Sequence, residues 1–255
     1  MRIARRAAAG ILGLSVAAAG VIAVEVVLAI NGRSLPARRP LRLDGRYGPA
    51  AGEPISVVWL GDSIGSGVGA SGPAAAVAVV VAESLGRPVD LRVPAVSGAR
   101  VDDVLGEQIA ALARAPADVV ILAIGSNDVT HLTGRAVFEA RYEATLRAIE
   151  AVRPDAAVVV TVGVGNFGSV PRFAQPLRAI AGWRARSLAA VIEEASRGHG
   201  LPFVDIHART GEAFATDPER YYATDGFHPS DAGYRLWADA VLDVLRPAVE
   251  ARFPS

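Results

Sequence analysis

Downstream of residue 54, the hydrophobic positions follow two patterns that alternate along the chain. Short runs composed almost entirely of Val, Ile and Leu are separated by longer stretches in which apolar residues recur at helical spacing. The short runs predict five strands that are buried on both faces: Ile55–Leu60, Val89–Val93, Val119–Ile124, Ala157–Val162 and Phe203–Ile206. The longer stretches predict five helices: Pro73–Leu85, Val101–Ala113, Arg135–Val152, Gln175–Arg197 and Asp231–Glu250. This alternation predicts a three-layer α/β/α fold, in which helices cover both faces of a five-stranded parallel sheet.

The first 30 residues follow a different pattern. Three arginines lie among the first six residues, and the run Ala7–Ile30 contains one strongly polar residue, Glu25. As a helix this run would be roughly 36 Å long, comparable with a hydrocarbon core of about 30 Å, whereas the apolar region of a signal peptide has about 7–15 residues. The length favours a retained transmembrane anchor, and the sequence Val27–Ala29, which resembles a cleavage site, leaves a cleaved signal as the alternative.

Residues 31–54 contain four prolines among Arg and Gly and show no sustained periodicity, which is typical of a linker. We therefore predict a membrane-directing segment at 1–30, a linker at 31–54 and one folded domain at 55–255. Arginines lie on both sides of the apolar run, so the positive-inside rule does not decide its orientation. We expect the domain to lie outside the cytoplasm, either anchored in the membrane or secreted.

Composition narrows the range of functions. Twenty-six basic residues balance 26 acidic residues, so the chain lacks the positive field that attracts proteins to nucleic acid, and we expect no nucleic-acid partner. The sequence has no cysteine, which excludes disulfides, thiolate nucleophiles and cysteine-ligated metal centres. The spacing of His131, His199 and His207 is not that of a metal site, so we expect no metal. We expect no cofactor either.

Several polar residues directly follow predicted strands or precede a predicted helix. Ser63 follows the first strand, Gly98 follows the second, Asn127 follows the third, and Asp225 and His228 precede the last helix. Reactive groups in an open parallel sheet gather at the carboxyl ends of the strands, where loops meet helix N-termini. We therefore expect these side chains to converge at one edge of the sheet.

These residue types suit nucleophilic catalysis. A serine hydroxyl becomes a nucleophile when an imidazole removes its proton, and a carboxylate must hold that imidazole in the correct tautomer. Ser63, His228 and Asp225 fit these three roles. The backbone N–H groups of Ser63 and Gly98, together with the Asn127 carboxamide, would stabilise the oxyanion of a tetrahedral intermediate. Because an unperturbed histidine titrates near about 6.5, activity should fall in acid.

The motifs Gly61–Ser63, Gly98, Gly125–Asp128 and Asp225-x-x-His228 resemble, in order and spacing, the four successive blocks of the SGNH/GDSL hydrolase family. The resemblance covers roughly residues 55–250. It implies a flavodoxin-like sheet, no metal, and activity on esters or thioesters through an acyl-enzyme intermediate. A serine esterase acting on lipid, acyl or acetyl esters is the function that it favours.

Other functions remain open at this point. The same residues would suit an acyltransferase or deacetylase that acts on glycans or glycolipids of the cell envelope, and a catalytically silent binding module is a third possibility. The loop 163–176 carries Phe167 and Phe173, which would either bind the acyl chain of a substrate or pack against the core. We expect a small-molecule or lipid ester as partner, and the membrane through the N-terminal segment.

Two other motifs overlap the serine. The sequence Gly61-x-Ser63-x-Gly65 also fits the nucleophile elbow of α/β-hydrolases, but there the serine follows several earlier strands. The sequence Gly65-x-Gly67-x-x-Ala70 fits the fingerprint of dinucleotide-binding proteins weakly, since Asp62 and Ser63 are inserted before its glycines. Taken singly, Ser, Asn and Asp are common cap and turn residues, so the hydrolase interpretation depends on the combination of the four motifs.

Overall fold

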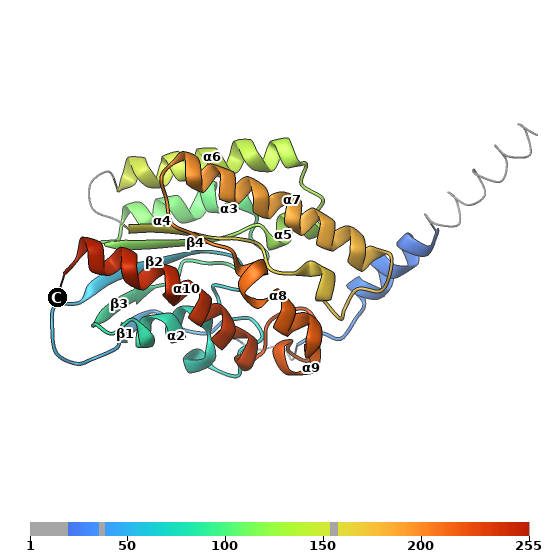
Figure 1. Cartoon of the computed structure of the whole chain (residues 1–255), viewed down its shortest axis with the longest axis horizontal. Coiled ribbons are helices and arrows are strands. Elements are labelled where there is room, and N and C mark those ends of the chain that lie inside the picture. The colour runs from blue at the N-terminus through green and yellow to red at the C-terminus, as the bar shows by residue number, and fades with distance from the viewer. Residues whose placement is uncertain (1–19, 36–38, 154–157, 255) are drawn as a thin grey trace, which may run out of the picture.

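The computed structural model describes residues 20–35, 39–153 and 158–254. Within them the strands form one six-stranded sheet in the order β1-β3-β2-β4-β5-β6. The strands are β1 (Gly45–Tyr47), β2 (Ile55–Gly61), β3 (Val89–Arg92), β4 (Val119–Ala123), β5 (Val158–Val162) and β6 (Phe203–Val204). The five strands β2 to β6 run parallel to one another, in an order typical of flavodoxin-like sheets (Figure 1). The central strands are apolar along their whole length because both of their faces are covered.

The prediction of a five-stranded, wholly parallel sheet is wrong at one edge. Strand β1 lies within the stretch 31–54 that was predicted as a linker, and it pairs with β3 in the antiparallel direction, with Gly45 opposite Leu91. Its residues Gly, Arg and Tyr carry no alternation of apolar and polar positions, and two of the three are exposed. The preceding Leu43 is buried, so the C-terminal part of this stretch packs on the domain.

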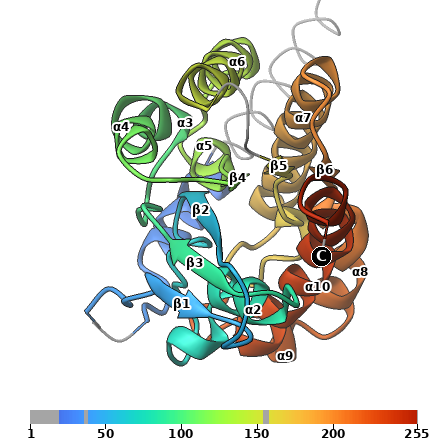
Figure 2. The same cartoon turned by 90° about the vertical axis from the view of Figure 1, so that its left-hand side faces the viewer.

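Helices cover both faces of the sheet (Figure 2). One face carries α2 (Val77–Ser84) and α10 (Asp231–Arg252), with α8 (Ile206–Thr216) and α9 (Pro218–Tyr221) packed beside α10. The other face carries α3 (Val101–Asp103), α4 (Ile109–Ala113), α5 (Ser126–Thr130), α6 (Arg135–Val152) and α7 (Leu177–Gly198). The predicted helices are therefore present, with small differences at their ends.

Three short helices, α5, α8 and α9, were not predicted. The sequence suggested that the last strand continues to Ile206, but the Asp205 side chain accepts a hydrogen bond of 2.9 Å from the backbone N–H of Ala208. This N-cap begins α8 directly after the two residues of β6. The predicted helix 101–113 contains a π-helical turn, Val104–Gln108, which no apolar periodicity indicates.

The N-terminal segment is described only from residue 20, and residues 20–30 are helical. No helix within the described ranges has both the length and the apolar character that crossing a bilayer requires. Most of the segment predicted as an anchor or signal lies outside these ranges, so that assignment stays a prediction.

His199, at the C-terminus of α7, joins this helix to α6. Its ring nitrogens lie 3.0 Å from the Glu143 carboxylate and 2.6 Å from the Glu150 carboxylate. Hydrogen bonds to Glu143 and to Glu150 raise the pKa of His199 above its usual value. Its contribution to stability is therefore complete below about pH 6.5 and is lost as the pH rises through the raised pKa.

We expect wild type to lose more stability than His199→Gln when the pH is raised from 6 to 9. The difference should be about 1 kcal/mol or less, because the two ion pairs are partly exposed and screened by solvent. Thermal unfolding midpoints of both proteins at both pH values measure it. A difference between the two proteins that does not change with pH would contradict this interpretation.

Candidate active site

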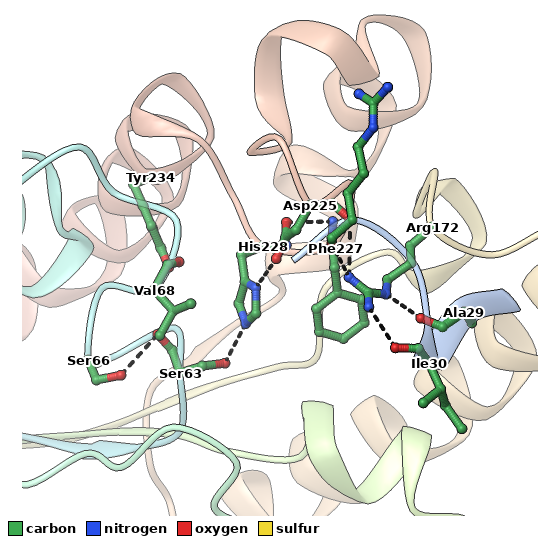
Figure 3. A network of polar contacts seen from close by, with 11 residues as sticks. Ala29, Ile30, Ser63, Ser66, Val68, Arg172, Asp225, Phe227, His228 and Tyr234 are labelled. Carbon is green, nitrogen blue, oxygen red and sulfur yellow. Dashed lines mark hydrogen bonds and ion pairs between the residues drawn. The ribbon is translucent and has the colours of Figure 1, made fainter. Parts of the chain in front are cut away.

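Ser63 lies in a tight turn at the carboxyl end of β2. The Asp62 carboxylate accepts a hydrogen bond of 3.0 Å from the backbone N–H of Ile64, which is the local bond typical of an Asx turn. The chain then folds back so that the N–H of Val68 donates to the carbonyl of Ser63 at 2.9 Å. These bonds fix the turn, and the Ser63 side chain points away from the sheet toward the loop before α10 (Figure 3).

Asp225 and His228 lie on the short loop that precedes α10. The Asp225 Oδ1 atom accepts hydrogen bonds from the backbone N–H groups of Phe227 (3.0 Å) and His228 (3.1 Å). Its other oxygen, Oδ2, lies 2.6 Å from His228 Nδ1. On the far side of the ring, His228 Nε2 lies 3.1 Å from the Ser63 Oγ atom, as Figure 3 shows. The structure thus joins all three side chains in one continuous hydrogen-bonded chain.

The two carboxylates near the ring have different electrostatics. Burial alone would raise the pKa of Asp225, but hydrogen bonds from the His228 ring and from the N–H of Phe227 outweigh it and hold the pKa below its usual value. Asp225 is therefore ionised over the working pH range, and Nδ1 of His228 carries the proton that it binds. Burial raises the pKa of Asp62 to about 6, against the opposite effect of the Ile64 hydrogen bond. Within the described structure Asp62 is not hydrogen-bonded to the ring, and its carboxylate serves the turn.

A close approach of two loops brings Ser63 within reach of His228. Gly69 has a φ of +100°, and a Cβ atom on it would collide with the carbonyl oxygen of Pro229 and lie 3.0 Å from the His228 Cβ atom. A residue with a side chain at this position would push the serine turn away from the loop before α10. Gly69 therefore belongs to the site, although it carries no reactive group.

The three candidate oxyanion donors come from different loops. Asn127, at the start of α5, donates from its Nδ2 atom to the carbonyl of Ala99 at 2.9 Å, which places the carboxamide beside the turn that contains Gly98. Gly98 adopts a φ of +88° in this turn. Neither Gly98 nor Ser63 donates its backbone N–H to another group within the described part of the chain. These two donors and the second proton of the Asn127 amide are available to an incoming oxyanion.

A half-open pocket lies beside Ser63, with a cavity volume of about 40 Å³. Most of its lining is apolar or aromatic. The lining residues are Ser63, Ile64, Ser126, Gly165, Asn166, Phe167, Val170, Thr210, Phe214, Tyr222, Phe227, Pro229 and Trp237. Such a lining suits a small apolar group bound next to the serine.

Phe167 and Phe173, the two candidate substrate-binding residues, have different places. Both are buried, but Phe167 lines the pocket and Phe173 does not. The Phe173 ring packs against Phe167 and Phe227, with centroids 6.3 Å and 5.8 Å away. The sequence left open whether these rings bind an acyl chain or pack against the core. In the structure Phe167 lines the cavity, and Phe173 packs behind it.

Gln108 is a residue of this site that the sequence did not indicate. Its side-chain amide is buried and makes two hydrogen bonds of 2.8 Å with Gly61, one accepted from the backbone N–H and one donated to the carbonyl. Gly61 ends β2 beyond the last residue of β3, so Gln108 occupies the place of a missing strand neighbour. The π-helical turn places this side chain, and no local signal in the sequence predicts such a turn.

Gln108→Ala should destabilise the protein by about 2–3 kcal/mol, because it leaves a buried N–H group without a partner and removes one of two bonds to the Gly61 carbonyl. We also expect a lower kcat with little change in KM, since Gly61 fixes the turn that carries Ser63. Thermal unfolding and steady-state kinetics on a soluble ester measure both effects. Glu107→Ala, which changes the exposed neighbour, is the control and should behave as wild type.

Among the described residues, no group of three or more His, Asp or Glu side chains is arranged to hold a metal ion. The chemistry that this site offers is that of a hydroxyl, an imidazole, a carboxylate and amide donors.

Comparison with known proteins agrees with this chemistry. A family model described as GDSL-like lipase/acylhydrolase matches residues 59–236, which is most of the chain and includes every residue of the hydrogen-bonded chain. The sequence is 29% identical over 225 residues to the GDSL-like esterase Rv1075c of Mycobacterium tuberculosis, an alignment that covers 82% of this chain and 71% of that protein.

The fold of this chain resembles those of several solved structures. A member of the lipolytic G-D-S-L family from Veillonella parvula superposes with a TM-score of 0.61 at 19% identity, covering 75% of this chain and 98% of that one. Phospholipase A1 from Streptomyces albidoflavus gives a TM-score of 0.54 at 23% identity, covering 78% and 100%. At these identities the likeness concerns the fold alone.

Proposed function

Because this chain belongs to the GDSL-like lipase/acylhydrolase family and is a hydrolase of the SGNH type, we propose that it cleaves carboxylic esters with Ser63 as nucleophile, His228 as general base and acid, and Asp225 as the group that orients the imidazole. The observation that carries this proposal is the continuous contact from the Ser63 hydroxyl through both nitrogens of His228 to the Asp225 carboxylate, at 3.1 Å and 2.6 Å. Both distances lie within the range that proton transfer requires.

In the proposed mechanism, Ser63 Oγ attacks the ester carbonyl while His228 Nε2 takes the hydroxyl proton. The Asp225 carboxylate stabilises the imidazolium that forms and keeps its ring in place. The negative oxygen of the tetrahedral intermediate receives hydrogen bonds from the N–H groups of Ser63 and Gly98 and from the Asn127 amide. His228 then protonates the leaving alcohol, and water releases the acyl group from Ser63 by the same steps in reverse order.

The pocket suggests which part of the substrate lies beside the serine. Its walls are formed largely by Phe167, Phe214, Tyr222, Phe227 and Trp237, which offer no charged partner. Burial of apolar surface is favourable by roughly 25 cal/mol per Å². We therefore assign the pocket to the acyl group of the substrate. The proposed substrates are esters of apolar carboxylic acids, and esters of polar acids are not expected to bind well.

A fluorophosphonate probe tests the proposal directly. The probe should phosphonylate the full-length protein at one site, with loss of fluoride, and peptide mass mapping should place the adduct on Ser63. Hydrolysis of a panel of p-nitrophenyl esters should follow, and product analysis with added sugar or lipid alcohols would distinguish hydrolysis from acyl transfer. Absence of labelling, or an adduct on another residue, would contradict the proposed nucleophile.

Phe167→Ala should shift the preference of the enzyme toward longer acyl chains by about ten-fold in relative kcat/KM, because it enlarges the pocket by most of a ring. Phe173→Ala is the matched control, since that ring is equally buried but does not line the pocket. It should lower stability and leave the chain-length preference almost unchanged. Relative rates on p-nitrophenyl esters from acetate to decanoate measure both variants, and equal profiles for the two would contradict the assignment of the pocket.

A further inference from the structure

The helix at residues 20–30 is fixed to the domain at its middle and at its C-terminal end. The carboxylate of Glu25 is buried and accepts a hydrogen bond of 2.8 Å from the first backbone N–H of α7. A negative charge there offsets the partial positive charge of a helix N-terminus. The guanidinium of Arg172 donates to the carbonyl of Ala29 at 2.6 Å and to that of Ile30 at 3.3 Å, which satisfies carbonyl groups that a helix end leaves unpaired. The helix is therefore docked, and it is not a free tether.

The same arginine touches the loop that carries the proposed acid and base. The backbone N–H of Arg172 donates to the carbonyl of Gly226 at 3.0 Å, and its Nη1 atom lies 3.5 Å from the carbonyl of Asp225. Two residues earlier, Val170 lines the acyl pocket. Figure 3 shows the end of the docked helix and the hydrogen-bonded chain of the site on either side of this loop. The docked helix thus meets the domain beside the mouth of the active site.

Apolar side chains without cover lie at this same end of the sheet. In the described part of the hydrolase domain, the exposed large apolar residues are Val96, Leu132, Val137, Ile180 and Trp183. Val96 follows β3 and Leu132 follows α5, and the other three lie in the first two turns of α6 and α7. In β-α-β units each helix begins at the carboxyl end of the preceding strand. All five therefore lie at the end of the domain that carries Ser63.

Two of these residues have properties typical of a surface that binds an apolar partner. Leu132 is 67% exposed and is held in the left-handed position that caps α5, with a φ of +57°, so that its apolar side chain is presented to solvent. Trp183 is 63% exposed, and tryptophan is enriched where proteins meet the headgroup region of a membrane. Val24, Leu28 and Ile30 on the docked helix are also exposed.

The length of chain before the docked part fits a bilayer. Glu25 is held against α7, so the apolar run available to cross a membrane is shorter than its full extent. Positions 7–24 would form a helix of roughly 27 Å, close to a hydrocarbon core of about 30 Å. Residues 7–19 lie outside the described part, and their apolar composition comes from the sequence. Figure 1 shows residues 20–30 leaving the domain at the end where α5 and α8 lie.

We propose that the carboxyl end of the sheet rests on a lipid bilayer, that the N-terminal helix enters this bilayer at about Glu25, and that the ester substrate is a lipid whose acyl group reaches Ser63 from the membrane surface. The contacts of Glu25 and Arg172 hold the mouth of the active site at that surface. This inference rests on the proposed ester hydrolase function and adds the physical source of the substrate.

The absence of native cysteine allows a direct test of the orientation. Single-cysteine variants Leu132→Cys and Trp183→Cys, and the control Ala113→Cys at the exposed end of α4 on the opposite side of the domain, are made in the full-length protein and labelled with nitrobenzoxadiazole. They are then reconstituted in vesicles of phosphatidylcholine and phosphatidylglycerol that contain a lipid spin-labelled near the headgroup. Labels at 132 and 183 should lose roughly half of their fluorescence to the spin label, and the label at 113 should not. Equal quenching at all three positions would overturn the proposal. The proposal would also be overturned if the label at position 132 were shielded from quenching to an extent that rises with protein concentration, because a second copy of the chain would then cover this surface.

A second experiment keeps the inference separate from the proposed function. The double variant Leu132→Asp/Trp183→Asp should hydrolyse a long-chain umbelliferyl ester in vesicles about ten-fold more slowly, because charged groups are unfavourable at the membrane interface. Its rate on soluble p-nitrophenyl acetate should stay close to that of wild type. Unchanged rates on both substrates would contradict the proposed membrane-binding surface and would leave the proposed ester hydrolase function unaffected. Loss of both rates would indicate a damaged fold, and the quenching experiment, which does not use this variant, then decides. Glu25→Ala should reduce the quenching at position 132, because it removes the bond to α7.

Discussion

Replacing Ser63 by alanine is expected to lower kcat for ester hydrolysis by about 10⁶-fold while leaving the fold intact, since the loss of the serine of a triad has about this effect in other hydrolases. The reason is that, among the residues that the structure describes, no other hydroxyl is hydrogen-bonded to the His228 ring: Ser63 Oγ lies 3.1 Å from Nε2, and the opposite nitrogen is bound to Asp225. The remaining rate would come from the oxyanion donors and from binding alone.

The control for this prediction lies in the same turn. Ser66 donates its hydroxyl to the carbonyl of Ser63 and has no contact with the ring, so Ser66→Ala should retain nearly full activity. Steady-state kinetics on a soluble ester, supported by circular dichroism of both variants, makes the comparison. Residual activity of Ser63→Ala within a hundred-fold of wild type would show that another group is the nucleophile.

Asp225→Asn should lower kcat by about 10⁴-fold, with a small effect on KM. The asparagine oxygen can still accept the backbone N–H groups that Asp225 Oδ1 accepts, so the loop should keep its shape. Its amide nitrogen, however, would face His228 Nδ1 and donate to it. The ring proton would then move to Nε2, and that nitrogen would lose its ability to accept the Ser63 proton.

Asp231→Asn provides the matched control, because this carboxylate also lies near the start of α10 but bonds Ser71 and makes no contact with the triad. Its kcat should stay within a few-fold of wild type. Measurement of kcat and KM for both variants, together with the rate of fluorophosphonate labelling, tests the tautomer argument. If Asp225→Asn and Asp231→Asn lose activity equally, the orienting role of Asp225 is wrong.

The parallel strands and the convergence of the polar residues were predictable from sequence because both depend on local patterns. Strands such as β4 are buried on both faces and consist of Val, Ile, Leu and Ala throughout, which gives a clear signal. Ser63 and Asn127 each follow such a strand, and Asp225 precedes His228 by three positions. Once the strands were placed, the topology of a parallel sheet brought these residues to one edge.

The features that sequence analysis missed depend on contacts between distant segments. Strand β1 is short and largely exposed, and it is defined by its pairing with β3. Gln108 reaches Gly61 only because a π-helical turn directs its side chain inward. Glu25 was visible as a single polar residue in an apolar run, but its partner at the start of α7 lies about 150 positions away in sequence. No spacing rule relates such residues, so a structure is needed to find them.

Because Asp225 and His228 lie on one loop, the distance between His228 and Ser63 is the one part of the proposed catalytic geometry that can vary. Their mutual bond and both backbone bonds to Asp225 are internal to four consecutive residues, so any shift of α10 would carry acid and base as one rigid unit. Only the gap to the serine oxygen would open or close. Conditions that move this helix should therefore change kcat by changing the distance between Ser63 Oγ and His228 Nε2. The shape of the pH profile should stay the same.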